Sequence, residues 1–177
     1  MYTLITPDGA GGSPRLVASE PLSVADFFAI AAQLQTPPAT ARKIALVAGR
    51  LSKTTQQIET RWNGKETYNT AGPNDWIVTS LANDRSPLRD STGNLNTYVI
   101  RSERFPELYE ATTGRNAFGN LYRSISEVEA IYLAGGFENM APWQTLQQAA
   151  CGYLLRNGRE VYGNGAETFA ATYQFTR

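Results

Sequence analysis

Two stretches of this chain carry the same spacing of tyrosine, glutamate and phenylalanine. Residues 97–110 read TYVIRSERFPELYE, and residues 161–174 read VYGNGAETFAATYQ. Because self-similarity marks repeated structural units, the shared pattern Y-x4-E-x-F-x3-Y predicts a tandem duplication. The matched positions are Tyr98 with Tyr162, Glu103 with Glu167, Phe105 with Phe169, and Tyr109 with Tyr173.

Two blocks further upstream agree with this duplication. DWIV (residues 75–78) aligns with GYLL (152–155), and VAGRL (47–51) aligns with LAGGF (133–137). The blocks come in the same order in both halves of the chain. We therefore expect an α+β fold of two similar small antiparallel-sheet units, each a partial barrel, related by a pseudo-twofold duplication. The expected segments, packed into one compact domain, are residues 1–40, 41–115 and 116–177.

The segment 1–40 is expected to combine an arm with a helix. Residues 1–20 show little apolar periodicity and contain DGAGGSP, which lacks the Lys-Ser/Thr of a phosphate-binding loop, so we expect a loosely docked arm. Residues 21–35 (PLSVADFFAIAAQLQ) place apolar side chains at helical spacing. Ser23 is of a type favoured at helix N-caps, and the Pro-Pro pair at 37–38 ends the pattern.

The two halves differ in how one pair of strands is connected. Asn63-Gly64 and Asn157-Gly158 are both typical of tight hairpin turns, and the second joins its strands directly. In the first half, polar residues 82–96 (ANDRSPLRDSTGNLN) separate the strands 75–81 and 97–102. A loop this long suggests either recruitment for function or neutral lengthening, which costs little stability.

Composition excludes several function classes. Sixteen basic and sixteen acidic residues cancel, which argues against nucleic acid as the partner. Histidine is absent and cysteine occurs once, as Cys151 in an apolar run, so no metal site, cofactor or His-based catalytic arrangement is expected. Cys151 is expected to be buried. With one cysteine, no apolar span and no secretory signal, the sequence indicates a cytoplasmic protein that does not enter a membrane.

The turn and strand at residues 71–80 (AGPNDWIVTS), followed by the Phe-x3-Tyr-Glu of residues 105–110, resemble a known family. It is a small domain of bacteriophage and bacterial proteins with a Pro-Gly-Asp-Tyr/Trp-Ile turn-strand and a terminal Phe-x3-Tyr-Glu. The resemblance covers residues 44–110, and residues 128–174 more weakly. Asn74 stands where the family has glycine, and Gly152 replaces the aspartate in the second copy. The family has no assigned reaction, so the resemblance implies architecture rather than activity.

Five residues are candidates for ligand contact, each with a structural alternative. The carboxylate at position 75 could accept a hydrogen bond from a ligand or act as a general base. Alternatively, it could accept hydrogen bonds from backbone amides of the turn. Tryptophans near turns could stack against a base or sugar of a ligand, or they could simply pack over the edge of a sheet. Arginines near the 82–96 loop (positions 85, 89, 101 and 104), with one at position 50, suit an anion or a mixed charged surface. The candidate set is Arg50, Trp62, Asp75, Arg101 and Trp143.

These patterns favour a non-catalytic binding protein for a small polar or phosphorylated, nucleotide-like ligand or for a protein partner, a second copy of the chain included. A hydrolase or transferase that uses Asp75 with Glu103 or Glu167 as acid and base is a second hypothesis. In the competing structural interpretation, each glutamate caps a short helix. A PUA-like nucleic-acid-binding module is a third hypothesis, and a structural component of a phage-like particle is a fourth.

Overall fold

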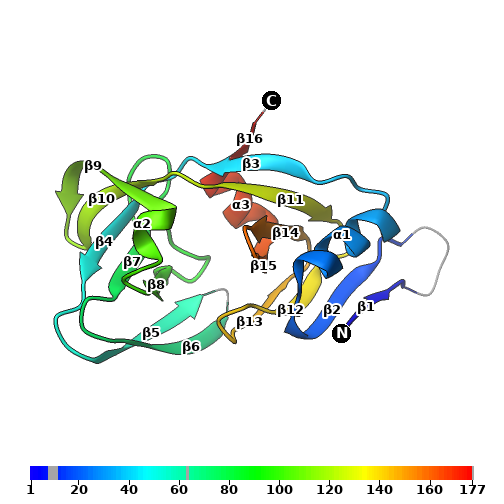
Figure 1. Ribbon diagram of the computed structural model, residues 1–177, viewed down its shortest axis with the longest axis horizontal. Helices are drawn as coiled ribbons and strands as arrows, with labels where there is room; N and C mark the ends of the chain where they lie inside the picture. Colours follow the sequence, from blue (N-terminus) through cyan, green and yellow to red (C-terminus); the bar gives the residue numbers. More distant parts are fainter. Residues whose placement is uncertain (8–11, 63, 177) are drawn as a thin grey trace. The chain divides into compact units, whose positions relative to one another are not determined.

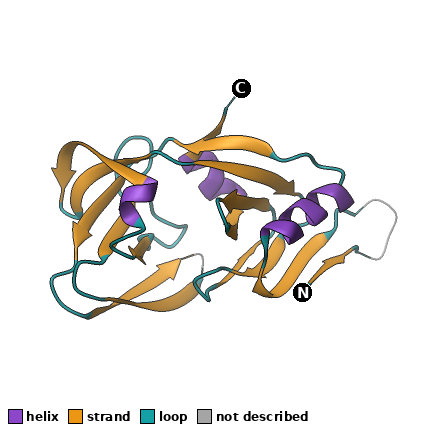
Figure 2. Ribbon diagram, in the orientation of Figure 1, coloured by secondary structure: helices purple, strands orange, loops and turns teal. Residues whose placement is uncertain are grey.

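Antiparallel β-sheets make up most of this protein. The structure is a computed structural model that describes residues 1–7, 12–62 and 64–176. Strands account for 54% of the chain and helices for 12%, so the protein is mostly β rather than α+β (Figure 2). The antiparallel sheets expected from the sequence are confirmed. Among the described residues the sheets stay open, and none closes into a barrel.

The chain forms two compact units that interleave along the sequence. Unit 1 contains residues 1–42 and 127–177, and unit 2 contains residues 43–126 (Figure 1). These units are defined by contacts within the structure. Their boundaries differ from those of the segments 41–115 and 116–177, which are the repeats expected from the sequence.

Unit 2 is built on a five-stranded sheet in the order β8-β7-β4-β10-β9. A separate hairpin, β5–β6, contacts β8, and the short helix α2 precedes β9. The elements of unit 2 are β4 (Val47–Leu51), β5 (Gln56–Trp62), β6 (Lys65–Ala71), β7 (Trp76–Ser80), β8 (Thr97–Ile100), α2 (Phe105–Leu108), β9 (Tyr109–Asn116) and β10 (Gly119–Ser124). The hairpin around residues 63–64 is thus present, although Asn63 lies outside the described residues.

Unit 1 contains a five-stranded sheet in the order β15-β14-β11-β3-β16 and a four-stranded sheet in the order β1-β2-β12-β13. The pairing of β2 with β12 is parallel. Its strands are β1 (Tyr2–Ile5), β2 (Arg15–Pro21), β3 (Ala39–Lys43), β11 (Glu127–Leu133), β12 (Phe137–Met140), β13 (Leu146–Ala149), β14 (Gly152–Asn157), β15 (Glu160–Gly165) and β16 (Tyr173–Phe175). Its helices are α1 (Val24–Gln33) and α3 (Ala166–Thr172).

The N-terminal segment is partly different from expectation. Residues 2–5 and 15–21 are paired strands, so the expected loose arm is wrong there, while residues 8–11 lie outside the described part of the chain. The strands form because β2 places Leu16 and Ala18 in the core of unit 1, where they bury apolar surface.

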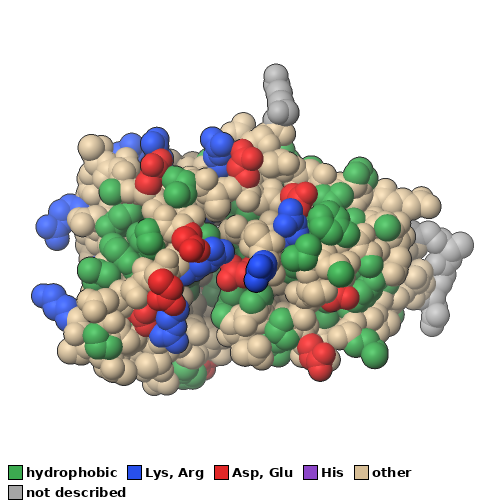
Figure 3. Space-filling view, in the orientation of Figure 1, with side chains coloured by type: hydrophobic (Ala, Val, Ile, Leu, Met, Phe, Trp, Pro, Cys, Tyr) green, Lys and Arg blue, Asp and Glu red, His purple; other side chains and the backbone are tan. Residues whose placement is uncertain are grey.

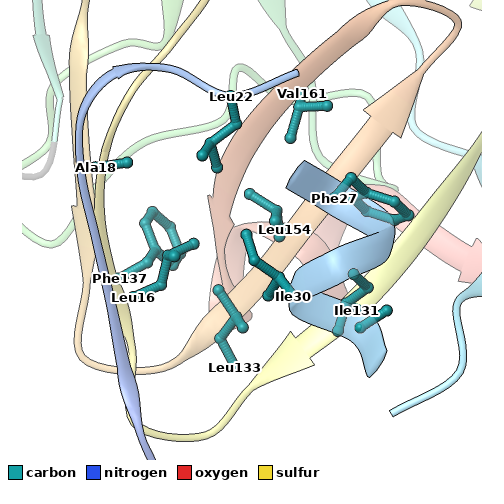
Figure 4. Close-up of a cluster of buried hydrophobic side chains, with 11 residues drawn as sticks. Leu16, Ala18, Leu22, Phe27, Ile30, Ile131, Leu133, Phe137, Leu154 and Val161 are labelled. Carbon is teal, nitrogen blue, oxygen red and sulfur yellow. The ribbon is translucent and has the colours of Figure 1, made fainter. Parts of the chain in front are cut away.

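The expected helix is confirmed with the expected cap. The Ser23 hydroxyl accepts a hydrogen bond from the Asp26 amide (3.1 Å), and the Asp26 carboxylate accepts one from the Ser23 amide (2.9 Å). This reciprocal capping box starts α1. Phe27 and Ile30, one helical turn apart, project into the main core of unit 1 beside Leu154 and Val161 (Figure 4).

Each unit contains a stack of three aromatic rings built from the sequence pattern. In unit 2, the Phe105 ring stacks on Trp76 (centroids 3.9 Å apart) and on Tyr109 (5.2 Å). In unit 1, the Phe169 ring stacks on Tyr153 (4.0 Å) and on Tyr173 (5.0 Å). Phe105 and Phe169 are both buried, and each packs on the tyrosine four residues after it.

The order of elements also matches between the units. β4, β7, β8, α2 and β9 of unit 2 follow one another as β11, β14, β15, α3 and β16 do in unit 1. In each five-stranded sheet one strand leads directly into the other unit along the chain. β3, which leads directly into β4 of unit 2, pairs with β11, whereas β10, which leads into β11 of unit 1, pairs with β4.

The ladder registers correct one block of the sequence alignment. Leu51 is the partner of Trp76, and Tyr132 is the partner of Tyr153. Val47–Leu51 therefore corresponds to Val128–Tyr132, and the alignment with residues 133–137 is wrong. When the corrected alignment is extended without a gap, Gln56 at the start of β5 corresponds to Phe137 at the start of β12. The same alignment places Trp62 opposite Trp143.

Candidate functional site

Asp75 is the most buried of the five candidate residues, with 6% of its surface exposed. It follows the Gly72-Pro73 turn that leads into β7. Its carboxylate accepts hydrogen bonds from the Gly72 amide (2.8 Å), the Ser102 amide (3.2 Å) and the Arg101 guanidinium (2.5 Å). These contacts tie the start of β7 to the chain that leaves β8.

The surroundings of Asp75 favour its charged form. Burial acts to raise the pKa of this carboxyl, but the hydrogen bonds from Gly72, Arg101 and Ser102 and the charge of Arg101 hold the pKa below its usual value. A general acid at neutral pH needs a raised pKa. The geometry therefore supports the structural interpretation, in which the Asp75 carboxylate holds a turn.

Unit 1 fills the corresponding space differently. Gly152 and Gly165 face each other at the positions that match Asp75 and Arg101. A Cβ on Gly152 would lie 2.4 Å from the Asn164 carbonyl oxygen and 2.9 Å from the Phe137 ring. At this position the Phe137 ring lies against the backbone of unit 1, whereas unit 2 has the Asp75–Arg101 ion pair. The matching sheet of unit 1 therefore forms without such a pair.

Of the candidates, only Asp75 and Arg101 are brought together by a described contact. Arg50 is exposed on β4 opposite Ile77, and Trp62 is half-buried at the end of β5. Trp143 belongs to unit 1, is 48% exposed and lies 5.4 Å from the Tyr162 ring. Ligand contact by Arg50, Trp62 and Trp143 stays a prediction.

The expected loop at residues 82–96 is folded back on itself. Leu81 bridges to Pro87 and Arg89 bridges to Leu95. At its base, the Leu88 amide donates to the Ser80 carbonyl (2.9 Å), and the Ser80 amide donates to the Asn96 carbonyl (2.9 Å). Apart from these links, the loop follows no regular ladder.

Asp90 organises the tip of this loop. Its carboxylate accepts hydrogen bonds from the amide and hydroxyl of Thr92 (2.9 Å each) and from the amide and side chain of Asn94 (2.9 and 3.1 Å). Desolvation acts to raise the pKa of Asp90, but these bonds lower it. Sequence reasoning missed this role, although Asp, Thr and Asn at alternate positions are a pattern typical of side-chain-capped turns.

The arginines expected to form an anion patch are engaged in other ways. Arg89 donates to the Gly93 carbonyl (2.6 Å), Arg104 pairs with Glu107 (2.5 Å) and Arg101 pairs with Asp75. Figure 3 shows basic and acidic side chains next to one another on the face in view. This arrangement supports a mixed charged surface rather than an anion patch.

The two glutamates of the repeated pattern do not cap the helices through hydrogen bonds, although Glu167 lies in the first turn of α3, where negative charge is favoured. Neither α2 nor α3 has a side-chain hydrogen bond at its N-cap. Glu103 and Glu167 are exposed, and Glu103 accepts a hydrogen bond from the Ser102 hydroxyl (3.1 Å). The described contacts give neither of them a place beside Asp75 as an acid–base partner.

Metal-type side chains are dispersed in the part of the chain that the structure describes. No group of three or more His, Cys, Asp or Glu residues gathers there. Cys151, expected to be buried, is half-buried. Among the described residues, no helix has the length and apolar character needed to cross a membrane.

Comparison of the chain with family models, with curated proteins and with solved structures finds no significant match.

Proposed function

We propose that the protein is a non-catalytic binding protein built from two copies of one small β unit, and that it holds a protein partner through the loop at residues 82–96. The matched aromatic stacks and the matched order of elements support the duplication. The loop is the largest difference between the two matched hairpins, because β14 and β15 are joined by a tight turn. Binding residues commonly lie on loops held by a rigid scaffold.

The observation that carries this proposal is the internal order of the loop. Its tip is fixed by the Asp90 carboxylate, and its base is fixed on Ser80 and Asn96. A neutral insertion needs no such network. A loop that is ordered before binding loses less conformational entropy when a partner arrives, which raises affinity.

The chemistry of the loop favours a polar protein surface as its partner. Asn83, Arg85 and Arg89 are exposed along it, and Arg85 is held in a left-handed conformation (φ 68°). The loop therefore presents both donors and acceptors at its surface. Rims of protein–protein interfaces have this polar character.

The test is affinity capture with the full chain, followed by measurement of the dissociation constant with the purified partner. Asp90→Ala should unlock the loop tip and weaken binding about tenfold, because ordering the loop would then oppose binding. Arg61→Ala on the β5–β6 hairpin is the control and should bind as the wild type does. A partner that binds both variants with equal affinity would contradict a role for the loop.

A further inference from the structure

Three polar groups converge at one end of the aromatic core of unit 2. The Lys43 ammonium lies 3.5 Å from the Tyr98 hydroxyl and 3.3 Å from the Tyr109 hydroxyl, and the two hydroxyls are 3.3 Å apart. The three residues come from the end of β3, from β8 and from the start of β9. We call this triangle of donors the Lys43 cluster.

The charge of Lys43 is not balanced by a carboxylate within the described part of the chain. Its ammonium contacts two neutral hydroxyls and lies over the rings of Tyr98 (6.0 Å) and Tyr109 (5.6 Å). Lys43 is half-buried, and no described Asp or Glu forms an ion pair with it. A partly desolvated cation with neutral neighbours creates a positive potential that attracts an anion.

The surroundings of Tyr98 indicate the same preference for negative charge. Burial acts to raise the pKa of Tyr98, but the charge of Lys43 and hydrogen bonds from Tyr109, Ser80 and Lys43 lower it. Ser80 is buried and also accepts a hydrogen bond from the Asn96 side chain (3.3 Å). The surroundings of the Tyr98 hydroxyl thus stabilise an oxygen atom that carries negative charge.

Unit 1 shows that the duplicated frame does not need this lysine. In the corrected alignment, Lys43 corresponds to Ser124, whereas Tyr98 and Tyr109 correspond to Tyr162 and Tyr173. The tyrosines are therefore common to both units, and the cation is specific to unit 2. Sequence reasoning did not single out Lys43, because the three residues are far apart in the chain.

We propose that the Lys43 cluster binds the oxyanion of a small molecule, either a carboxylate or a phosphate group. One oxygen of the ligand accepts hydrogen bonds from the Lys43 ammonium and from the two phenol hydroxyls, in place of the bonds that these groups make to one another. Lys43 and Tyr98 are both half-buried as whole residues. This proposal does not rest on the protein partner proposed for the loop.

The test is thermal unfolding of the full chain in rising concentrations of sodium phosphate or sodium acetate, with sodium chloride keeping the ionic strength constant. Saturable stabilisation by phosphate alone, by acetate alone or by both supports the site and distinguishes the two sources of the oxyanion. Absence of saturable stabilisation by either anion would overturn the proposal.

Variants locate the effect. Lys43→Met should weaken anion binding about tenfold or more, because a charge-assisted hydrogen bond is lost. Lys53→Met removes the same charge from an exposed turn of unit 2 and should bind as the wild type does. If Lys43→Met does not fold, Tyr98→Phe and Tyr109→Phe each remove one donor and should weaken binding several-fold. Equal anion binding by both tyrosine variants and the wild type would exclude the cluster.

Discussion

At the residue scale, the Asp75 carboxylate determines how the chain turns into β7. Asp75→Asn removes the ion pair with Arg101 and keeps the shape of the side chain, so we expect a loss of about 2 kcal/mol in the free energy of unfolding, since a buried donor network is left incomplete. Chemical denaturation measures this loss. Glu103→Gln, in an exposed position, is the matched control and should change the free energy little.

The same substitution should change the acid dependence of stability. Because the pKa of Asp75 is lower in the folded protein, its charged form stabilises the fold above about pH 4, the ordinary aspartate value. This contribution is lost as the pH falls through the lowered folded pKa. The difference in unfolding free energy between wild type and Asp75→Asn should therefore shrink on acidification. A difference that stays constant down to strongly acidic pH would show that the carboxylate charge is not the cause.

Gly163 is a residue of unit 1 at which there is no space for a side chain. A Cβ there would lie 2.2 Å from Cε2 of Phe137 and 2.7 Å from Oδ1 of Asn139. Gly163→Ala should lower the free energy of unfolding by about 1–3 kcal/mol, because the Phe137 ring must move within a packed core. Gly165→Ala is the control, since its Cβ would meet only Ala149 at 3.7 Å. Equal melting temperatures for the two variants would contradict this account.

At the element scale, the sequence predicted the parts that depend on neighbouring residues. The capped helix at Ser23, the strand at Trp76 and the hairpin at Asn157-Gly158 follow from local patterns and are all present. The strand β3 was not predicted, because its pairing with β11 depends on residues far along the chain. For the same reason, the contact of Asp75 with Arg101 and the Lys43 cluster had no sequence signal.

The β5–β6 hairpin is an element that depends on a few contacts. Thr60 is buried on β5, as Ala71 is on β6, and the Thr60 hydroxyl donates to the Thr97 carbonyl at the start of β8. A two-stranded hairpin is marginally stable alone. Thr60→Val keeps the shape but loses this bond, so amides of β5 and β6 should exchange with solvent faster while those of β4 and β7 do not. Glu59→Gln on the exposed face should leave exchange unchanged, and faster exchange throughout unit 2 would contradict local anchoring.

At the scale of the whole molecule, each unit contains a strand that leads directly into the other unit along the chain, β3 in unit 1 and β10 in unit 2. If the chain is a duplication, its copies run from β3 to β9 and from β10 to β16. The first strand of each copy then lies in the sheet of the other, since β3 pairs with β11 and β10 pairs with β4. Such an exchange joins the folding of the two units without requiring an interface between them.

This exchange predicts which unit a substitution disturbs. Ala41 lies in β3, a few residues before β4, yet it is fully buried in the core of unit 1. Leu121 lies in β10, just before β11, yet it is buried in unit 2. Ala41→Asp should therefore reduce hydrogen-exchange protection of β11 and β14, and Leu121→Asp that of β4 and β7, because an unpaired charge enters one core in each case. The two variants are each other's control. Loss of protection in unit 2 for Ala41→Asp or in unit 1 for Leu121→Asp, or equal loss in both units for both variants, would contradict the pairing of β3 with β11 and of β10 with β4.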